Sequence, residues 1–156
     1  MHVESSNDAY APLAAEWPEP DRAERAQSWR EWIAGSDRVD LVAEVDGAIV
    51  GFISGGRNRV EGVEAALEIY VIHVLPAHRG RDVGGQLWAR ACALLRGPEL
   101  RSLVVDTFAE LRCCRFYERR GGQVATRSAG RFHGGAVTDV VYRWPDGVAS
   151  LPAEDP

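Results

Sequence analysis

The residues best suited to chemistry lie in the stretch 74–85, where an apolar run ends at Pro76 and a short loop of arginine and glycine follows. A segment with helical periodicity begins a few residues later, at Val83. Such a loop directs unpaired backbone N–H groups and the positive end of a helix toward one point. Glycine there lets a phosphate approach the backbone. The spacing predicts an anion-binding loop; a tight strand-to-helix turn with solvated arginines has the same spacing.

The basic residues narrow the chemistry further. Apart from four histidines they are all arginine, because the sequence contains no lysine. The phosphate-binding lysine of nucleotide-binding P-loops, a Schiff-base lysine and a lysine general base are therefore excluded. A phosphate group would have to be held by backbone N–H groups, a helix N-terminus and arginine.

A second motif, Phe116-Tyr117-Glu118-Arg119-Arg120-Gly121, follows about 30 residues after the loop. Together the two motifs resemble those of the GNAT acetyltransferases. That family carries Q/R-x-x-G-x-G/A after a strand ending in V-x-P, which Arg79 to Gly84 follows, and an F-Y-E-x-x-G stretch in the next helix. The resemblance covers residues 5–144 and includes the order of the elements.

The resemblance implies an α/β fold with a mixed sheet, the GNAT acyl-CoA N-acyltransferase fold. It also implies an enzyme that moves acetyl from acetyl-CoA directly to a primary amine of a small molecule or protein. The Val74 amide would stabilise the oxyanion, and Tyr117 would protonate the leaving thiolate; the alternative for Tyr117 is a core tyrosine with a satisfied hydroxyl. The residues expected to contact the cofactor are Ile72, His73, Val74, Arg79, Gly80, Arg81, Asp82, Val83, Gly84 and Gly85.

Three residues are candidates for the general base. Glu68 stands where similar family members place a glutamate, and strand alternation predicts that it shares a face with Tyr70 and Ile72. Asp106 ends a buried strand, where it could equally cap a helix. His73 titrates in a suitable range, but alternation places it on the face opposite to Glu68.

The chain also departs from the family pattern. The family's middle glycine is Asp82 here. A carboxylate beside the bound pyrophosphate would weaken the binding of the cofactor by about 1 kcal/mol. The family's first edge strand, which precedes the first helix, is missing. A non-catalytic acyl-CoA-binding module with the same fold is therefore the alternative function, and a dinucleotide-binding domain is disfavoured because GxGxxG is absent.

The elements that must position these residues follow from the periodicity and the turn residues. Helices are predicted over residues 5–15, 21–34, 83–95 and 110–120. Strands are predicted over residues 41–45, 48–53, 67–75, 102–105, 124–127 and 137–144. Asp46-Gly47 between the first two strands predicts a hairpin.

Composition sets the outer limits. The 156 residues predict one domain, 1–145, and a loose tail, 146–156. The net charge of −5 gives no global attraction to nucleic acid or to an anionic membrane, and neither a membrane span nor a signal peptide is expected. We therefore expect a cytoplasmic protein. Exposed sheet edges would allow a homodimer, and the three cysteines predict neither a disulfide nor a metal site.

Overall fold

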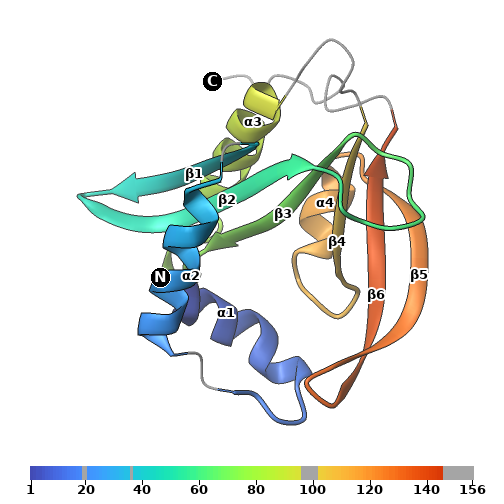
Figure 1. The fold of residues 1–156 in the computed structure, drawn as a ribbon, viewed down its shortest axis with the longest axis horizontal. Coiled ribbons are helices and arrows are strands. Elements are labelled where there is room, and N and C mark those ends of the chain that lie inside the picture. The colour runs from blue at the N-terminus through green and yellow to red at the C-terminus, as the bar shows by residue number, and fades with distance from the viewer. Residues whose placement is uncertain (19–20, 36, 96–101, 146–156) are drawn as a thin grey trace.

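A mixed sheet forms the centre of this computed structural model, which describes residues 1–18, 21–35, 37–95 and 102–145. Within those residues the strands lie in the order β1-β2-β3-β4-β6-β5 (Figure 1). Only β3 and β4 pair in parallel; the other neighbours are antiparallel. The strands are β1 Arg38–Val45, β2 Ala48–Arg57, β3 Leu67–Val74, β4 Leu103–Phe108, β5 Gln123–Phe132 and β6 Gly135–Trp144.

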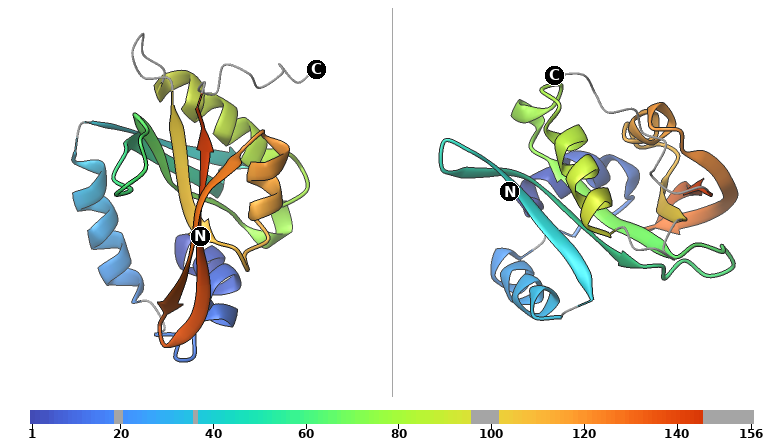
Figure 2. Two further views of the ribbon diagram at one scale, coloured as in Figure 1. Left: turned by 90° about the vertical axis from the view of Figure 1, so that its right-hand side faces the viewer. Right: turned by 90° about the horizontal axis from the view of Figure 1, so that it is seen from above.

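Helices cover both faces of this sheet, and α2 and α3 lie on opposite faces (Figure 2). Trp88 of α3 is fully buried in the main core, which also contains Ile53, Ile69, Leu103 and Val140. On the other face, α2 packs Trp29 and Trp32 against β2 and β3. The helices are α1 His2–Tyr10, η1 Ala11–Leu13, α2 Arg22–Ile33, η2 Pro76–His78, α3 Val83–Leu95 and α4 Cys114–Arg119.

Several local predictions are confirmed. Asp46 and Gly47 both have positive φ, at 51° and 77°, as the hairpin turn between β1 and β2 requires. The Asp21 side chain accepts hydrogen bonds from the backbone N–H groups of Ala23 and Glu24, so it caps α2. The mixed α/β fold is also as predicted.

Other boundaries differ from the prediction. The helix expected over 110–120 is only Cys114–Arg119. The last two strands extend through the segment expected to be a glycine-rich turn, and the reversal is confined to His133 and Gly134, both with positive φ. The predicted tail, 146–156, lies outside the described residues.

The predicted alternation along β3 is wrong because the strand contains a β-bulge. Ser54 pairs with Val71 and Gly55 with Ile69, so Tyr70 is an extra residue on β3. Before the bulge Ile69 faces the α3 core, and after it Ile72 does. Glu68, Tyr70 and His73 therefore share the face that α1 and α2 cover, and His73 is not opposite to Glu68 as alternation had predicted.

Candidate active site

The two parallel strands at the centre of the sheet separate along their length. Along the whole of β3 and β4, both fully described, pairing is limited to Leu67 with Leu103 and Glu68 with Val104. The strands then diverge toward their carboxyl ends (Figure 1). The remaining backbone of β3 has no strand partner on that side, and a ligand with amide groups could pair with it.

Val74 lies at the open end of β3. The Leu75 N–H donates to the Val50 carbonyl of β2 at 2.9 Å. Because successive N–H groups of a strand point to opposite sides, the Val74 N–H is directed away from β2, toward the gap. The Val74 carbonyl accepts a hydrogen bond from Arg79 Nε at 3.0 Å, and Arg79 Nη1 pairs with Asp8 of α1. The start of the predicted anion loop is thus tied to β3 and α1.

The loop leads directly into the first turn of α3. Gly80 and Asp82 have positive φ, at 73° and 56°, so Asp82 adopts the left-handed conformation that favours glycine. The first helical hydrogen bond runs from Gln86 N to Asp82 O. The N–H groups of Val83, Gly84 and Gly85 precede it and lack helical partners. This is the arrangement that favours an anion at a helix N-terminus.

Side chains from α4 and from Arg120, the residue that follows it, cover this first turn. Phe116 lies 3.4 Å from the place of a Cβ on Gly84. A Cβ on Gly85 would collide with the Asp82 carboxylate and would lie 2.7 Å from Arg120 Nη2. Asp82 Oδ1 and Arg120 Nη2 are 3.8 Å apart. The sequence indicated arginines on this helix but not that Arg120 pairs with Asp82.

Tyr117 lies inside the core, on α4. It is 4% exposed, and its ring contacts those of Trp88, Tyr142 and Trp144. Burial, together with the neighbouring Cys113 thiol, raises the pKa of Tyr117 well above its usual value. The phenol therefore keeps its proton at neutral pH, which a general acid requires.

Glu68 is a buried carboxylate with a dedicated partner. Arg59, in the loop between β2 and β3, donates to it from its backbone N–H, Nε and Nη2, at 2.8, 3.2 and 3.0 Å. The Arg59 guanidinium lies 3.6 Å above the Tyr70 ring, which fixes its position. Sequence reasoning missed Arg59, because nothing in a loop arginine indicates which carboxylate it will reach.

Asp106 lies on the same face of the sheet but remains exposed. Partial burial and the nearby carboxylates of Asp139 and Glu68 raise its pKa. A carboxylate with a raised pKa is a better proton acceptor at neutral pH than an ordinary one.

His73 is enclosed by aromatic rings. It stacks on Phe52, with centroids 5.4 Å apart, and it meets the rings of His2 and Tyr10 from α1. Burial, the neighbouring His2 and Arg79 lower the pKa of His73 to about 3. The imidazole is therefore neutral at physiological pH.

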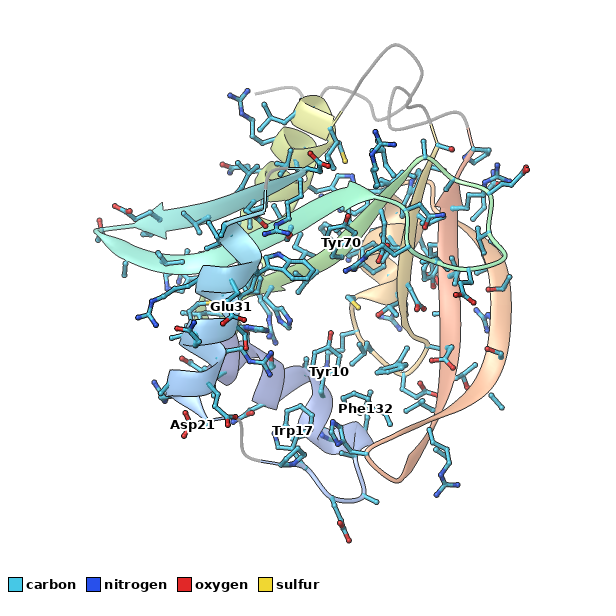
Figure 3. The ribbon with its side chains drawn as sticks, in the orientation of Figure 1. Tyr10, Trp17, Asp21, Glu31, Tyr70 and Phe132 are labelled. Atoms are coloured by element: carbon cyan, nitrogen blue, oxygen red, sulfur yellow. The ribbon has the colours of Figure 1, made fainter. Side chains whose placement is uncertain are left out.

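A group of half-buried aromatic side chains lies beyond β4, where α1 approaches the β5–β6 hairpin (Figure 3). Phe132 is at its centre, with ring centroids 5.7 Å from Tyr10, 5.8 Å from Trp17 and 5.0 Å from Phe108. Phe108 is two residues from Asp106 on the same face of β4. The aromatic group was not predicted, because its members come from four separate segments.

Among the residues that the structure describes, no helix is long and apolar enough to cross a membrane. Those residues also contain no group of three or more His, Cys, Asp or Glu side chains that could hold a metal ion.

Comparisons with known proteins agree with this geometry. The model of the acetyltransferase (GNAT) family matches residues 6–122. An N-acetyltransferase from Staphylococcus aureus Mu50 superposes with a TM-score of 0.72 at 17% identity, covering 93% of this chain and 89% of its own. The protein yncA from Salmonella typhimurium, solved with its cofactor acetyl-CoA, gives 0.68 at 20% identity, covering 99% and 91%.

A ribosomal-protein-alanine N-acetyltransferase from Brucella melitensis gives a TM-score of 0.67 at 22% identity, covering 92% of this chain and 91% of its own. No curated protein sequence matches the chain. The family model spans most of the chain, including the loop before α3 and the whole of α4. The chain therefore belongs to the acetyltransferase (GNAT) family, whose acyl donor is acetyl-CoA.

Proposed function

We propose that this protein transfers acetyl from acetyl-CoA directly to a primary amine of a small molecule or protein. The observation that carries the proposal is the divergence of β3 from β4. It opens a free strand edge beside the N-terminus of α3, and these two features fit two adjoining parts of one ligand. The edge suits the amides of pantetheine, and the helix N-terminus suits a pyrophosphate.

The cofactor contacts follow from this fit. Backbone groups of Ile72 and Val74 would pair with the pantetheine arm, and residues 79–85 would hold the pyrophosphate. The backbone of His73 pairs with Phe52 of β2. We therefore propose that the His73 backbone does not bind the cofactor, and that its ring instead closes the site on the face that α1 covers.

The chemistry would then be divided among few groups. When bound, acetyl-CoA supplies the thioester carbonyl that the amine attacks. The Val74 N–H would donate to the oxygen that gains negative charge. Tyr117 would supply a proton to the departing sulfur, since its phenol carries a proton at neutral pH.

We propose that the base is one of the carboxylates on the sheet face that α1 and α2 cover, which we call the acceptor face. Glu68 would contribute negative charge that attracts the substrate ammonium. Both of its oxygens already accept hydrogen bonds from Arg59, so removing a proton would require that contact to open. Asp106 has a raised pKa and stays exposed, which favours it as the proton acceptor.

The aromatic group favours one kind of acceptor. Tyr10, Phe108 and Phe132 would bury an apolar or aromatic portion of the substrate beside Asp106. We therefore propose an amine carried on an apolar group, in preference to a highly charged polyamine.

Calorimetric titration with acetyl-CoA tests the cofactor half of the proposal, with NAD and ATP as controls. We expect selective micromolar binding of acetyl-CoA. A panel of amines, followed by release of free CoA thiol, then tests transfer. Selective binding without turnover on any amine would support the alternative, a non-catalytic acyl-CoA-binding module.

A further inference from the structure

Asp82 introduces a negative charge where the cofactor site calls for positive potential. It lies in the left-handed conformation at the start of α3. Its carboxylate lies against Gly85, so close that a Cβ on Gly85 would collide with it. Left alone, this carboxylate would repel an anion held by the N–H groups of the same turn.

Arg120 brings a compensating charge to the same place. It follows α4, and its Nη2 approaches both Asp82 Oδ1, at 3.8 Å, and the place of a Cβ on Gly85, at 2.7 Å. The side chain of Arg120 is 17% exposed, against 48% for that of Asp82. A cation is thus built into the contact between α4 and the first turn of α3.

The position of Arg120 is fixed by the core rather than by Asp82 alone. Its guanidinium lies 3.8 Å from the centre of the Phe116 ring, and Nη1 donates to the Phe116 carbonyl at 3.5 Å. Its backbone carbonyl accepts a hydrogen bond from Trp144 Nε1 at 2.7 Å. The separation of 3.8 Å from Asp82 exceeds that of a short charge-assisted hydrogen bond, so this pair is a loose one.

We propose that Arg120 is a cofactor-binding residue that neutralises Asp82 and contacts the pyrophosphate of acetyl-CoA at the N-terminus of α3. The proposal rests on the proposed function, in which acetyl-CoA binds along β3 and α3. The planar guanidinium can serve a carboxylate on one side and phosphate oxygens on the other. Because Arg120 follows Tyr117 by one helical turn, the same contact would couple cofactor binding to the placement of the proposed acid.

Calorimetry on Arg120→Gln tests the contact, with CoA, dephospho-CoA and pantetheine as the three ligands. We expect the affinities for CoA and dephospho-CoA to fall by the same factor, about tenfold or more. Pantetheine, which lacks the pyrophosphate, should bind both proteins equally, and this also shows that the variant is folded. The matched control is Arg119→Gln, since Arg119 is exposed and bonds its own helix through the Arg115 carbonyl.

Asp82→Asn provides a second measurement in both backgrounds. If Arg120 neutralises Asp82, the factor by which Arg120→Gln lowers CoA affinity should be about threefold smaller in the Asp82→Asn background than in the wild type. In that background no uncompensated carboxylate remains. Arg120→Lys should retain more affinity than Arg120→Gln, because it keeps the charge and loses only the planar fork.

Three outcomes would overturn the proposal. Unchanged CoA binding in Arg120→Gln would exclude the contact, while the proposed function would stand if the wild-type protein still bound acetyl-CoA. A loss confined to CoA, with dephospho-CoA unaffected, would move the contact to the 3′-phosphate. A wild-type protein that binds no acetyl-CoA would contradict the proposed function itself and this inference with it.

Discussion

Two carboxylates share the acceptor face of the sheet, but their surroundings suit different tasks. Glu68 is 8% exposed and held by three donors of Arg59. Asp106 keeps much of its surface in contact with solvent. The part of its carboxyl that is buried, together with the nearby carboxylates of Asp139 and Glu68, raises its pKa. The environment of each group, rather than its residue type, therefore decides which one is suited to accept a proton.

The acidic limb of the pH–rate profile should separate the two. Asp106→Asn should abolish the limb in kcat/KM and lower the rate at neutral pH about a hundredfold, within the range of general-base contributions. Glu68→Gln should keep the limb and act mainly through KM, because it removes an attracting charge. A limb that survives in Asp106→Asn and disappears in Glu68→Gln would reverse the two roles. Both variants should still bind acetyl-CoA. Glu64→Gln serves as a surface control, because Glu64 is exposed in the loop between β2 and β3.

Tyr117→Phe isolates the proposed acid. The ring packs among Trp88, Tyr142 and Trp144, and phenylalanine preserves that packing. Turnover should fall at least about tenfold, while acetyl-CoA affinity and the unfolding midpoint stay close to those of the wild type. Unchanged turnover would exclude Tyr117 from proton transfer. A lowered midpoint would instead show that the hydroxyl is structural.

At the scale of elements, the sequence is most informative where local chemistry decides the conformation. The hairpin turn depends only on Asp46 and Gly47, which both adopt positive φ. The cap of α2 depends only on Asp21 and the two backbone N–H groups that its side chain accepts from. The bulge at Tyr70 was not predictable in this way, because it arises from pairing with β2 across a long loop. It reverses the side-chain directions on β3 and brings His73 to the acceptor face. The same limit applies to the Arg120–Asp82 pair, which joins separate helices.

The first turn of α3 allows a matched pair of glycine substitutions. Gly84→Ala places a methyl group in ordinary contact with Phe116, and neither Asp82 nor Arg120 is among the atoms that it would meet. The affinity for acetyl-CoA should therefore fall only through crowding of the pyrophosphate by that methyl group, by about threefold at most. The unfolding free energy should rise by about 0.5 to 1 kcal/mol because alanine favours helix. Gly85→Ala should instead displace Asp82 and Arg120 and lower the affinity about fivefold, the scale of one exposed ion pair. Equal affinities in the two variants would argue that the Asp82–Arg120 contact is not used in binding.

On the scale of the whole molecule, the two faces of the sheet carry different tasks. The face covered by α3 and α4 holds the main core, the anion loop and Tyr117. The face covered by α1 and α2 holds the carboxylates and the aromatic rings. The gap between β3 and β4 connects them. An acceptor and a donor approaching from different sides could thus meet at one point in the sheet.

The attachment of α1 to this acceptor face makes the stability of the fold depend on pH. His2 of α1 accepts a hydrogen bond from Trp29 Nε1 at 2.8 Å and lies 5.3 Å from His73, measured between ring centroids. Burial, with Arg25 and the N-terminus nearby, lowers the pKa of His2 to about 4, and burial with His2 and Arg79 nearby lowers that of His73 to about 3. Both values lie below the 6.5 of an unfolded histidine, so the unfolded chain binds more protons between these limits.

Stability should therefore fall as the pH drops below about 6.5, and the loss should continue toward pH 3. Between pH 7 and pH 5 the contribution of His73 is about 2 kcal/mol, and that of the more solvated His2 is smaller. Urea unfolding at the two pH values measures the loss. His73→Phe should reduce the difference between them, because phenylalanine fills the ring site without titrating, whereas His133→Asn, at an exposed position, should leave it unchanged. An equal pH dependence in wild type and His73→Phe would mean that acid destabilises the fold through groups other than His73.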